Sequence, residues 1–299
     1  MKTSDYPYFK LPFDEFNVAQ ATAIPFVDKD VNMVVSFSTA VGKTAIAECA
    51  FGYHLSQDSG VCVYVSPLKG LSSEKYDSWK SGQFGKFGVA SISGEKSVDL
   101  KDLDKSRVVV ITAESFDSRV RNPLFKDWVK SISCVVYDEA HMIGDDSRGS
   151  SYECSAIRLS KINPSARIIL LSATLSNGLE VGKWVKSLNG KETKLVRSSW
   201  SPNKMVSEYH FTTLRNRMDK CMEVIEGIDP NEKAIIFVHS KLVGKSIQKS
   251  LAKKGISSLF HNASLSKKKR EEIEFLFSSK ISGYNILIST STLGAGVNL

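Results

Sequence analysis

Short apolar runs alternate with stretches of helical character along most of this chain, and this alternation constrains the fold more than any other feature. In the N-terminal part, runs typical of strands occupy residues 32–37, 61–65, 89–92, 107–111, 133–137 and 167–171. Stretches typical of helices lie between them, at residues 44–56, 68–80, 114–121 and 151–159. This order predicts a parallel sheet with helices on both faces, which binds ligands beyond the carboxyl ends of its strands.

A second alternation follows a segment rich in Ser, Pro and Asn. Its predicted strands are residues 208–212, 234–239, 258–261 and 285–289, and its predicted helices are residues 215–226, 241–254 and 266–277. We therefore predict an α/β protein with a first domain at residues 1–198, a linker at 199–207 and a second domain at 208–299. The second alternation stops soon after its last strand, so we expect that domain to be incomplete at its C-terminus.

The composition is that of an ordinary globular protein, with 42% hydrophobic and 24% charged residues among 299. The net charge of +8 suits a polyanionic partner. No apolar run has the length of a membrane span, and residues 1–10 lack the apolar core of a secretory signal. The five cysteines are scattered without metal-ligand spacing. We predict reduced core cysteines, no membrane association and an intracellular location, in the cytoplasm or in a eukaryotic nucleus.

The first candidate site is a Gly-Lys-Thr tripeptide between the strand at residues 32–37 and the helix at 44–56. Backbone N–H groups at a helix N-terminus attract phosphate. Lys43 would reach the outer phosphates, and the Thr44 hydroxyl would hold Mg²⁺. The full phosphate-loop pattern has Gly where this chain has Phe37, so an ordinary strand-to-helix turn is the alternative. The candidate loop comprises Thr39, Ala40, Val41, Gly42, Lys43 and Thr44.

The second candidate site is an acidic pair that directly follows the predicted strand at residues 133–137. Asp138 can bind Mg²⁺, and Glu139 can activate a water molecule. By itself the pair would be a solvated turn after a buried strand. Together with the loop, and in the same order along the chain, it favours a nucleoside triphosphatase.

Further polar residues follow predicted strands or precede the loop. Gln20 offers a donor and an acceptor to an adenine edge, although a surface role is the simpler reading. Ser172 and Thr174 either cap a helix or link the nucleotide state to a neighbouring domain. Residues near three other strand ends would contact the phosphates of a nucleic-acid strand: Pro67, Lys69 and Thr112.

The order of these segments resembles superfamily 2 nucleic-acid helicases of the DExH type over nearly the whole chain. Gln20 resembles the adenine-reading glutamine of that family, the loop at 39–44 its motif I, and residues 138–141 its motif II. Residues 67–71 and 112–114 are similar to motifs Ia and Ib, 172–174 to motif III, 237–241 to motif IV, and 290–298 to motif V. Arg148-Gly149 followed by Glu153 resembles the sequence of one branch of this family. That branch holds the Ski-type RNA helicases and the archaeal and HelQ-type DNA repair helicases.

The resemblance implies two RecA-like domains that bind ATP and Mg²⁺ and move along single-stranded or tailed DNA or RNA, 3′ to 5′. It adds His141 to the catalytic residues and Gly296 and Asn298 to the nucleotide contacts. It also adds Ser240 and Thr290 to the nucleic-acid contacts. We expect a monomer.

The sequence departs from the family pattern at Phe37 and Ala40, which replace glycines of motif I. Motif VI, which supplies an arginine finger in the family, would lie past Leu299. The alternative is therefore a nucleotide- and nucleic-acid-binding module without turnover of its own.

Overall fold

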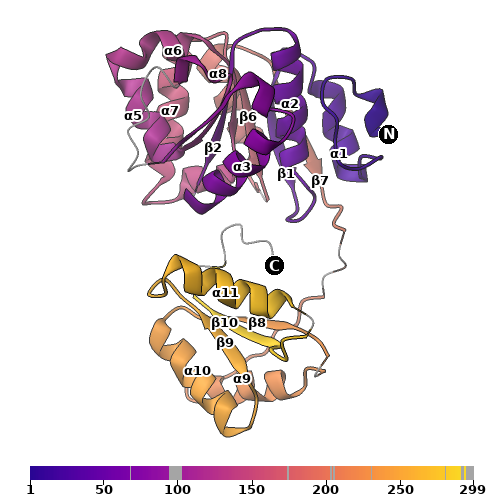
Figure 1. Cartoon of the computed structure of the whole chain (residues 1–299), viewed down its shortest axis with the longest axis vertical. Coiled ribbons are helices and arrows are strands. Elements are labelled where there is room, and N and C mark those ends of the chain that lie inside the picture. Colours follow the sequence, from indigo (N-terminus) through magenta and orange to yellow (C-terminus); the bar gives the residue numbers. More distant parts are fainter. Residues whose placement is uncertain are drawn as a thin grey trace. The chain divides into compact units, whose positions relative to one another are not determined.

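The computed structural model describes residues 1–67, 69–93, 103–173, 175–202, 204, 206–229, 231–279, 281–290 and 293, without the side chain of Lys69. The chain divides into two compact units, Met1–Lys204 and Met205–Leu299 (Figure 1). Each unit is an α/β layer structure with a parallel sheet. The predicted fold class, two parallel α/β sheets of the RecA-like kind, is confirmed.

The first unit contains a seven-stranded sheet in the order β3-β4-β2-β5-β6-β1-β7. All neighbouring strands in it run parallel. Its strands are β1 Asn32–Phe37, β2 Val61–Ser66, β3 Val89–Ile92, β4 Val108–Thr112, β5 Ile132–Tyr137, β6 Arg167–Ser172 and β7 Thr193–Ser198.

The inner strands of this sheet are apolar along their length because helices cover both faces. Every residue of β2, β4 and β6 is buried, whereas the edge strand β7 is mostly half-exposed. The helices and turns of this unit are η1 Thr3–Asp5, α1 Val18–Ala23, η2 Ile24–Phe26, α2 Thr44–Ser56, α3 Lys69–Ser81, η3 Gly85–Phe87, α5 Ala113–Arg121, η4 Pro123–Phe125, α6 Lys126–Lys130, η5 Ala140–Gly144, α7 Gly149–Ile162 and α8 Gly178–Asn189.

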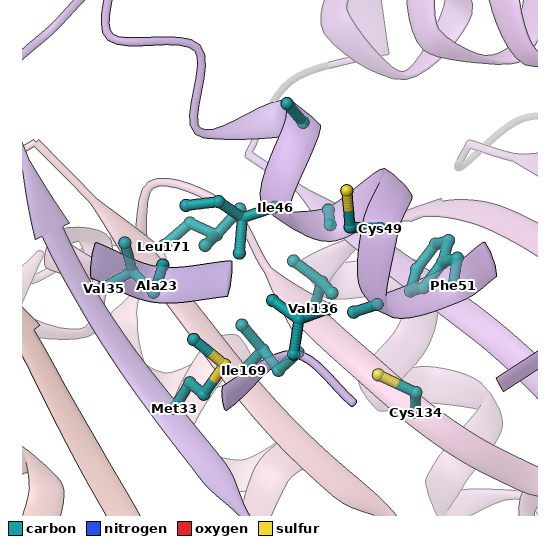
Figure 2. Packing of buried hydrophobic residues seen from close by; sticks show 14 of the residues in the cluster. Ala23, Met33, Val35, Ile46, Cys49, Phe51, Cys134, Val136, Ile169 and Leu171 are labelled. Atoms are coloured by element: carbon teal, nitrogen blue, oxygen red, sulfur yellow. The ribbon is translucent and has the colours of Figure 1, made fainter. Parts of the chain in front are cut away.

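Two hydrophobic clusters sandwich the sheet. One lies under α1, α2 and α3, and Figure 2 shows its centre, where Ile46 and Phe51 of α2 meet Val136 of β5 and Leu171 of β6. The other cluster lies under α5 to α8 on the opposite face. Cys49, Cys62 and Cys134 are fully buried, which confirms the prediction of core cysteines for these three.

A buried arginine fixes the segment that leads into β1. The Arg167 side chain is fully buried at the start of β6. Its guanidinium donates to the main-chain carbonyls of Phe26 and Val31, each at 2.7 Å, and to that of Val27. These bonds satisfy a charge that would otherwise be costly to bury, and they anchor the connection between α1 and the first strand.

The second unit has a smaller sheet in the order β8-β10-β9, again with parallel pairings. Helices α9 and α10 pack on one face and α11 on the other (Figure 1). Its elements are α9 Arg217–Glu226, β8 Ala234–Phe237, α10 Lys241–Lys253, β9 Ser258–His261, α11 Lys267–Ser278 and β10 Ile286–Ser289.

Two parts of the sequence behave differently from expectation. The strand predicted at residues 208–212 is wrong: this segment forms no strand, and Tyr209 and Phe211 are 82% and 94% exposed. Its polar–apolar alternation has no neighbouring strand against which to pair. Conversely, β7 and α8 were not predicted. Within the described residues no helix combines the length and apolar character needed to cross a lipid bilayer.

Candidate functional site

The polar residues predicted at strand ends meet at one edge of the first sheet. Because the strands are parallel and in register, Ser66 of β2 pairs with Thr112 of β4, and Ser36 of β1 pairs with Ser172 of β6. Asp138 directly follows β5, and its main-chain N–H donates to the Val65 carbonyl of β2 at 2.9 Å. This carboxyl edge therefore gathers the ends of five neighbouring strands, β4, β2, β5, β6 and β1.

The loop between β1 and α2 has the curvature of a phosphate-binding loop. Ala40 and Gly42 both have positive φ, at 62° and 79°, and Val41 between them is buried in the core. α2 begins at Thr44, with Lys43 as its N-cap. The exposed turn at Thr39 and Ala40 thus leads straight into the first main-chain N–H groups of a helix, where an anion is favoured.

Two side chains at the start of helix α1 are hydrogen-bonded to this loop. Asn17 caps α1, and Gln20 completes the capping box by accepting the Asn17 N–H at 3.1 Å. The Gln20 amide nitrogen donates to the carbonyls of Val41 and Gly42, both at 3.1 Å, and Asn17 Nδ2 donates to the Val41 carbonyl at 2.9 Å. Gln20 is 4% exposed, with both ends of its amide bonded within the chain, so its predicted contact with adenine stays a prediction.

The Lys43 ammonium folds back over the loop. Its Nζ donates to the carbonyls of Phe37 and Ser38, each at 3.3 Å. Burial lowers the pKa of Lys43 below its usual value, and the nearby carboxylates of Glu139 and Asp138 act in the opposite direction. Lys43 is therefore already close to the acidic pair, as the predicted site requires.

Asp138 and Glu139 differ in what their side chains contact. Asp138 Oδ2 accepts from the Tyr64 hydroxyl at 2.5 Å, and Oδ1 accepts from the Glu139 N–H at 3.0 Å. Glu139 has the left-handed φ of 49°. Its buried Oε2 accepts no hydrogen bond from the described residues. Burial, followed by the charge of Asp138, raises the pKa of Glu139, which makes this carboxylate a better base.

His141 lies between the acidic pair and the end of β6. Its Nδ1 is 3.3 Å from Glu139 Oε2 and 3.4 Å from the Ser172 hydroxyl. Glu139, His141 and Ser172 are thus neighbours here, while their catalytic and coupling roles stay predictions. Behind them the Tyr152 hydroxyl of α7 donates to the Asp138 carbonyl at 3.1 Å.

Two of the residues predicted to contact a nucleic-acid strand, Pro67 and Thr112, follow or end strands of this sheet and are engaged within the chain. The Pro67 carbonyl accepts from Arg148 Nη1 at 2.7 Å, and Arg148 Nε is 3.8 Å from Glu114. Thr112 is buried, and its hydroxyl donates to that of Ser115 at 3.0 Å. A phosphate bound by Thr112 would have to displace Ser115 or use main-chain groups.

The remaining predicted residues lie in the second unit or outside the described part of the chain. The Ser240 hydroxyl caps α10 by accepting the Val243 N–H at 3.3 Å. The Thr290 N–H donates to the His261 carbonyl at 3.2 Å. The predictions for Thr174, Gly296 and Asn298, and for the side chain of Lys69, lie outside the described residues.

Sequence reasoning missed the roles of three side chains at this edge: Asn17, Tyr64 and Arg148. Arg148 links the segments at Pro67 and Glu114. Asn17 was detectable, because an Asn three residues before Gln is a capping-box pattern. Tyr64 was not, because a tyrosine in an apolar strand looks like any other core residue until the neighbouring strand is in register.

Comparison with known proteins gives a consistent result. The sequence profile of the DEAD/DEAH box helicase family matches residues 17–181, and that of the helicase conserved C-terminal domain matches residues 216–299. The ATP-dependent DNA helicase Hel308 of Thermoplasma volcanium is 30% identical over 100% of this chain and 48% of its own length. Hel308 of Methanococcus vannielii is 28% identical over 91% of this chain and 43% of its own length.

The chain therefore spans less than half the length of these curated relatives. Among solved structures, the Mycobacterium smegmatis helicase Lhr, bound to single-stranded DNA and AMP-PNP, is similar with a TM-score of 0.63. The match covers 92% of this chain and 39% of Lhr at 22% identity, and it supports the fold.

Proposed function

Because this chain belongs to the DEAD/DEAH box helicase family, we propose that it is the motor core of a nucleic-acid helicase driven by ATP hydrolysis. The observation that carries the proposal is the contiguity of the phosphate loop and the acidic pair. Lys43 is close enough to Glu139 and Asp138 for their charges to act on its pKa, and Tyr64, whose hydroxyl donates to Asp138, has Thr44 among its neighbours. The cation of the loop and the two carboxylates therefore lie together at the carboxyl edge of the sheet.

The loop would bind the triphosphate. Main-chain N–H groups at the start of α2 face the loop, and Lys43 would exchange its two carbonyl contacts for the outer phosphates. A phosphate oxygen carries more negative charge than a carbonyl oxygen, so this exchange favours the bound state.

The oxygen donors at the site fit a magnesium ion. Thr44 and Asp138 supply a hydroxyl and a carboxylate, which are the hard ligands that Mg²⁺ prefers together with water and phosphate oxygens. When bound, Mg²⁺ supplies charge neutralisation of the triphosphate. Asp138 keeps an open lone pair on each oxygen, because each accepts one hydrogen bond from the described residues.

Glu139 would take the proton of the attacking water. Its Oε2 is buried without a hydrogen-bond donor from the described residues, and its raised pKa increases its basicity. His141 Nδ1 lies 3.3 Å from the same oxygen without hydrogen-bond geometry and 3.4 Å from the Ser172 hydroxyl, so His141 would keep the carboxylate next to Ser172.

Single-stranded nucleic acid would bind along the same edge, beyond β2 and β4. The positive net charge of +8 and the main-chain groups near Pro67 and Thr112 support contacts to phosphates, which carry no sequence information. Because these relatives are named as DNA helicases, we propose DNA as the strand that this chain binds. The proposed 3′-to-5′ direction rests on the resemblance in motif order.

The test is steady-state ATP hydrolysis with and without single strands, in the unmodified chain, Glu139→Gln and Asp138→Ala. Glu139→Gln should keep nucleotide binding and lose turnover by about 10²-fold or more, because it removes the base and keeps the side-chain size. Asp138→Ala should instead weaken nucleotide binding that depends on Mg²⁺. Equal loss of binding in both variants contradicts the assignment of Glu139, and nucleotide binding without any turnover supports the binding module instead.

A salt titration tests the nucleic-acid half of the proposal. The logarithm of the binding constant for single strands should fall with a slope of about −0.7 per phosphate contact against the logarithm of salt concentration. DNA and RNA strands of equal length, each in two unrelated sequences, form the four arms. A flat salt dependence or a strong preference for one sequence contradicts binding through the backbone.

A further inference from the structure

Tyr64 places one polar atom in the middle of an apolar strand, directly beneath the candidate metal site. Its side chain is 1% exposed, and its ring packs edge-on against Trp79 with centroids 5.1 Å apart. A phenylalanine would make the same ring contact. The hydroxyl is therefore the feature that needs an explanation, because burying a hydroxyl is unfavourable unless it is hydrogen-bonded.

That hydroxyl is hydrogen-bonded to a side chain that the proposed function assigns to Mg²⁺. It donates to Asp138 Oδ2 at 2.5 Å. A phenol hydroxyl has one proton, so this bond uses the proton that Tyr64 can donate and fixes the carboxylate relative to β2.

The two hydrogen bonds of Asp138 determine which of its lone pairs stay open. One lone pair of Oδ2 is bound by Tyr64, and one of Oδ1 is bound by the Glu139 N–H. The carboxylate is thus held with acceptor sites unused among the described residues, as a ligand of a hard cation must be.

We infer that Tyr64 is a positioning residue for the divalent cation, and that its hydroxyl orients the Asp138 carboxylate before the cation arrives. This inference rests on the proposed function. Groups that hold metal ligands in place from behind contribute to metal affinity although they do not contact the metal.

Two other buried tyrosines show that the arrangement is particular to Tyr64. Tyr137, also 1% exposed, shares its hydrogen bond with the Ser155 hydroxyl at 3.1 Å. Tyr152 donates to the main-chain carbonyl of Asp138 at 3.1 Å. Among the described residues neither hydroxyl is hydrogen-bonded to a carboxylate, so Tyr137 is a matched control for losing a buried phenol in the same sheet.

The experiment compares the unmodified chain with Tyr64→Phe and Tyr137→Phe. Binding of a fluorescent ADP analogue is followed while Mg²⁺ is added, and again in excess EDTA. We expect the Mg²⁺ concentration at half-saturation to rise about 10-fold in Tyr64→Phe and to stay unchanged in Tyr137→Phe. Nucleotide affinity in EDTA should be the same in all three proteins.

A second measurement needs no loss of the hydroxyl, so it holds even where Tyr64→Phe fails to fold. With 3-fluorotyrosine at position 64, the fluorine resonance should shift when Mg²⁺ is added to the nucleotide complex. The same label at position 137 should not respond. Both labelled proteins keep the rings that pack in the core.

The outcomes separate this inference from the function on which it rests. If the unmodified chain binds nucleotide with Mg²⁺ dependence but Tyr64→Phe has the same half-saturation and the label at 64 is silent, the inference alone is overturned. Equal weakening of Tyr64→Phe in EDTA and in Mg²⁺ also overturns it, because the hydroxyl then serves the loop. Absence of Mg²⁺-dependent binding in the unmodified chain overturns the proposed function and the inference together.

Discussion

The two units share an architecture but differ in how completely their sheets are enclosed. In the first unit, every residue of β2, β4 and β6 is buried. In the second unit the central strand β10 is buried in the same way, but the edge strand β8 alternates between half-buried and exposed positions, with Ile235 39% and Phe237 60% exposed. A strand that is packed on both faces is rigid, so the side chains that directly follow it have well-defined positions relative to one another.

The candidate catalytic groups among the described residues lie in the first unit, beside its enclosed strands. Asp138 and Glu139 directly follow β5, and Lys43 begins α2 after the loop that follows β1. The described part of the second unit offers helix caps such as Ser240 at the corresponding places. We therefore expect substitutions in the first unit to change ATP turnover. We also expect similar substitutions in the two units to lower the free energy of unfolding by different amounts.

The largest expected effect comes from removing the charge at the start of α2. Lys43→Ala should reduce ATP turnover by about 10³-fold, because the ammonium would neutralise the outer phosphates. Lys267→Ala, at the first position of α11, removes a lysine that is exposed and paired with Glu271, and should leave turnover unchanged. Turnover near the original level in Lys43→Ala, at full nucleotide occupancy, would place the catalytic charge elsewhere.

The contrast in enclosure is sharpest at two phenylalanines that each end a strand. Phe37 closes β1 and is fully buried, whereas Phe237 closes β8 and is 60% exposed. Phe37→Ala should lower the free energy of unfolding by about 4 kcal/mol, and Phe237→Ala by less than about 1 kcal/mol. Urea denaturation of both variants measures this, and similar losses would show that the exposed strand is covered in solution.

A smaller loss is expected from the buried arginine that anchors the entry to β1. Arg167→Met keeps much of the volume but leaves the carbonyls of Phe26, Val27 and Val31 without their donor, at a cost of about 3 kcal/mol. Arg217→Met on α9, where the side chain is exposed, is the control. The unfolding transition of the first unit should move while that of the second stays in place.

The smallest expected effect depends on pH. Burial lowers the pKa of His54 to about 4, and its Nε2 has no partner among the described residues. The folded chain therefore binds this proton less readily than the unfolded chain, so the contribution is intact above pH 6.5 and is lost as the pH falls toward 4.

Between pH 7.5 and pH 5 this histidine should cost the first unit about 2 kcal/mol of stability. His54→Gln should remove that part of the pH dependence, and His239→Gln, at an exposed position of the second unit, should not. The buried His261 of the second unit contacts Glu274 at 2.9 Å, which opposes the lowering of its pKa by burial. The second unit should consequently be less acid-sensitive, and chemical denaturation at both pH values checks this.

The sequence predicted the enclosed strands well because they are unbroken apolar runs. β7 was missed because four of the six residues in its Thr-Lys-Leu-Val-Arg-Ser sequence are polar, as an edge strand allows. The false strand at residues 208–212 shows the converse, because alternation suggests a strand only where a partner strand exists. The residues chosen at strand ends lie at one edge of the sheet because the strands themselves were predicted correctly, while their roles stay predictions.

What the sequence did not contain was the direction of individual side chains. Gln20 was interpreted as an adenine contact, yet its amide is bonded to the loop itself. Tyr64 and Asp138 are 74 residues apart, and their hydrogen bond depends on the register of β2 against β5. Such pairings are decided by tertiary packing, which residue spacing along the chain does not encode.

The contact between Gln20 and Gly42 limits which residues the loop can accept by mutation. A Cβ on residue 42 would lie 2.8 Å from the Gln20 amide nitrogen, and the φ of 79° disfavours any side chain there. Mutation at position 42 is therefore opposed twice, once by the backbone and once by a residue twenty-two positions earlier. The two positions are therefore coupled. A shorter side chain at position 20 would give space for a Cβ at position 42, but position 42 would still need a residue that tolerates the left-handed turn.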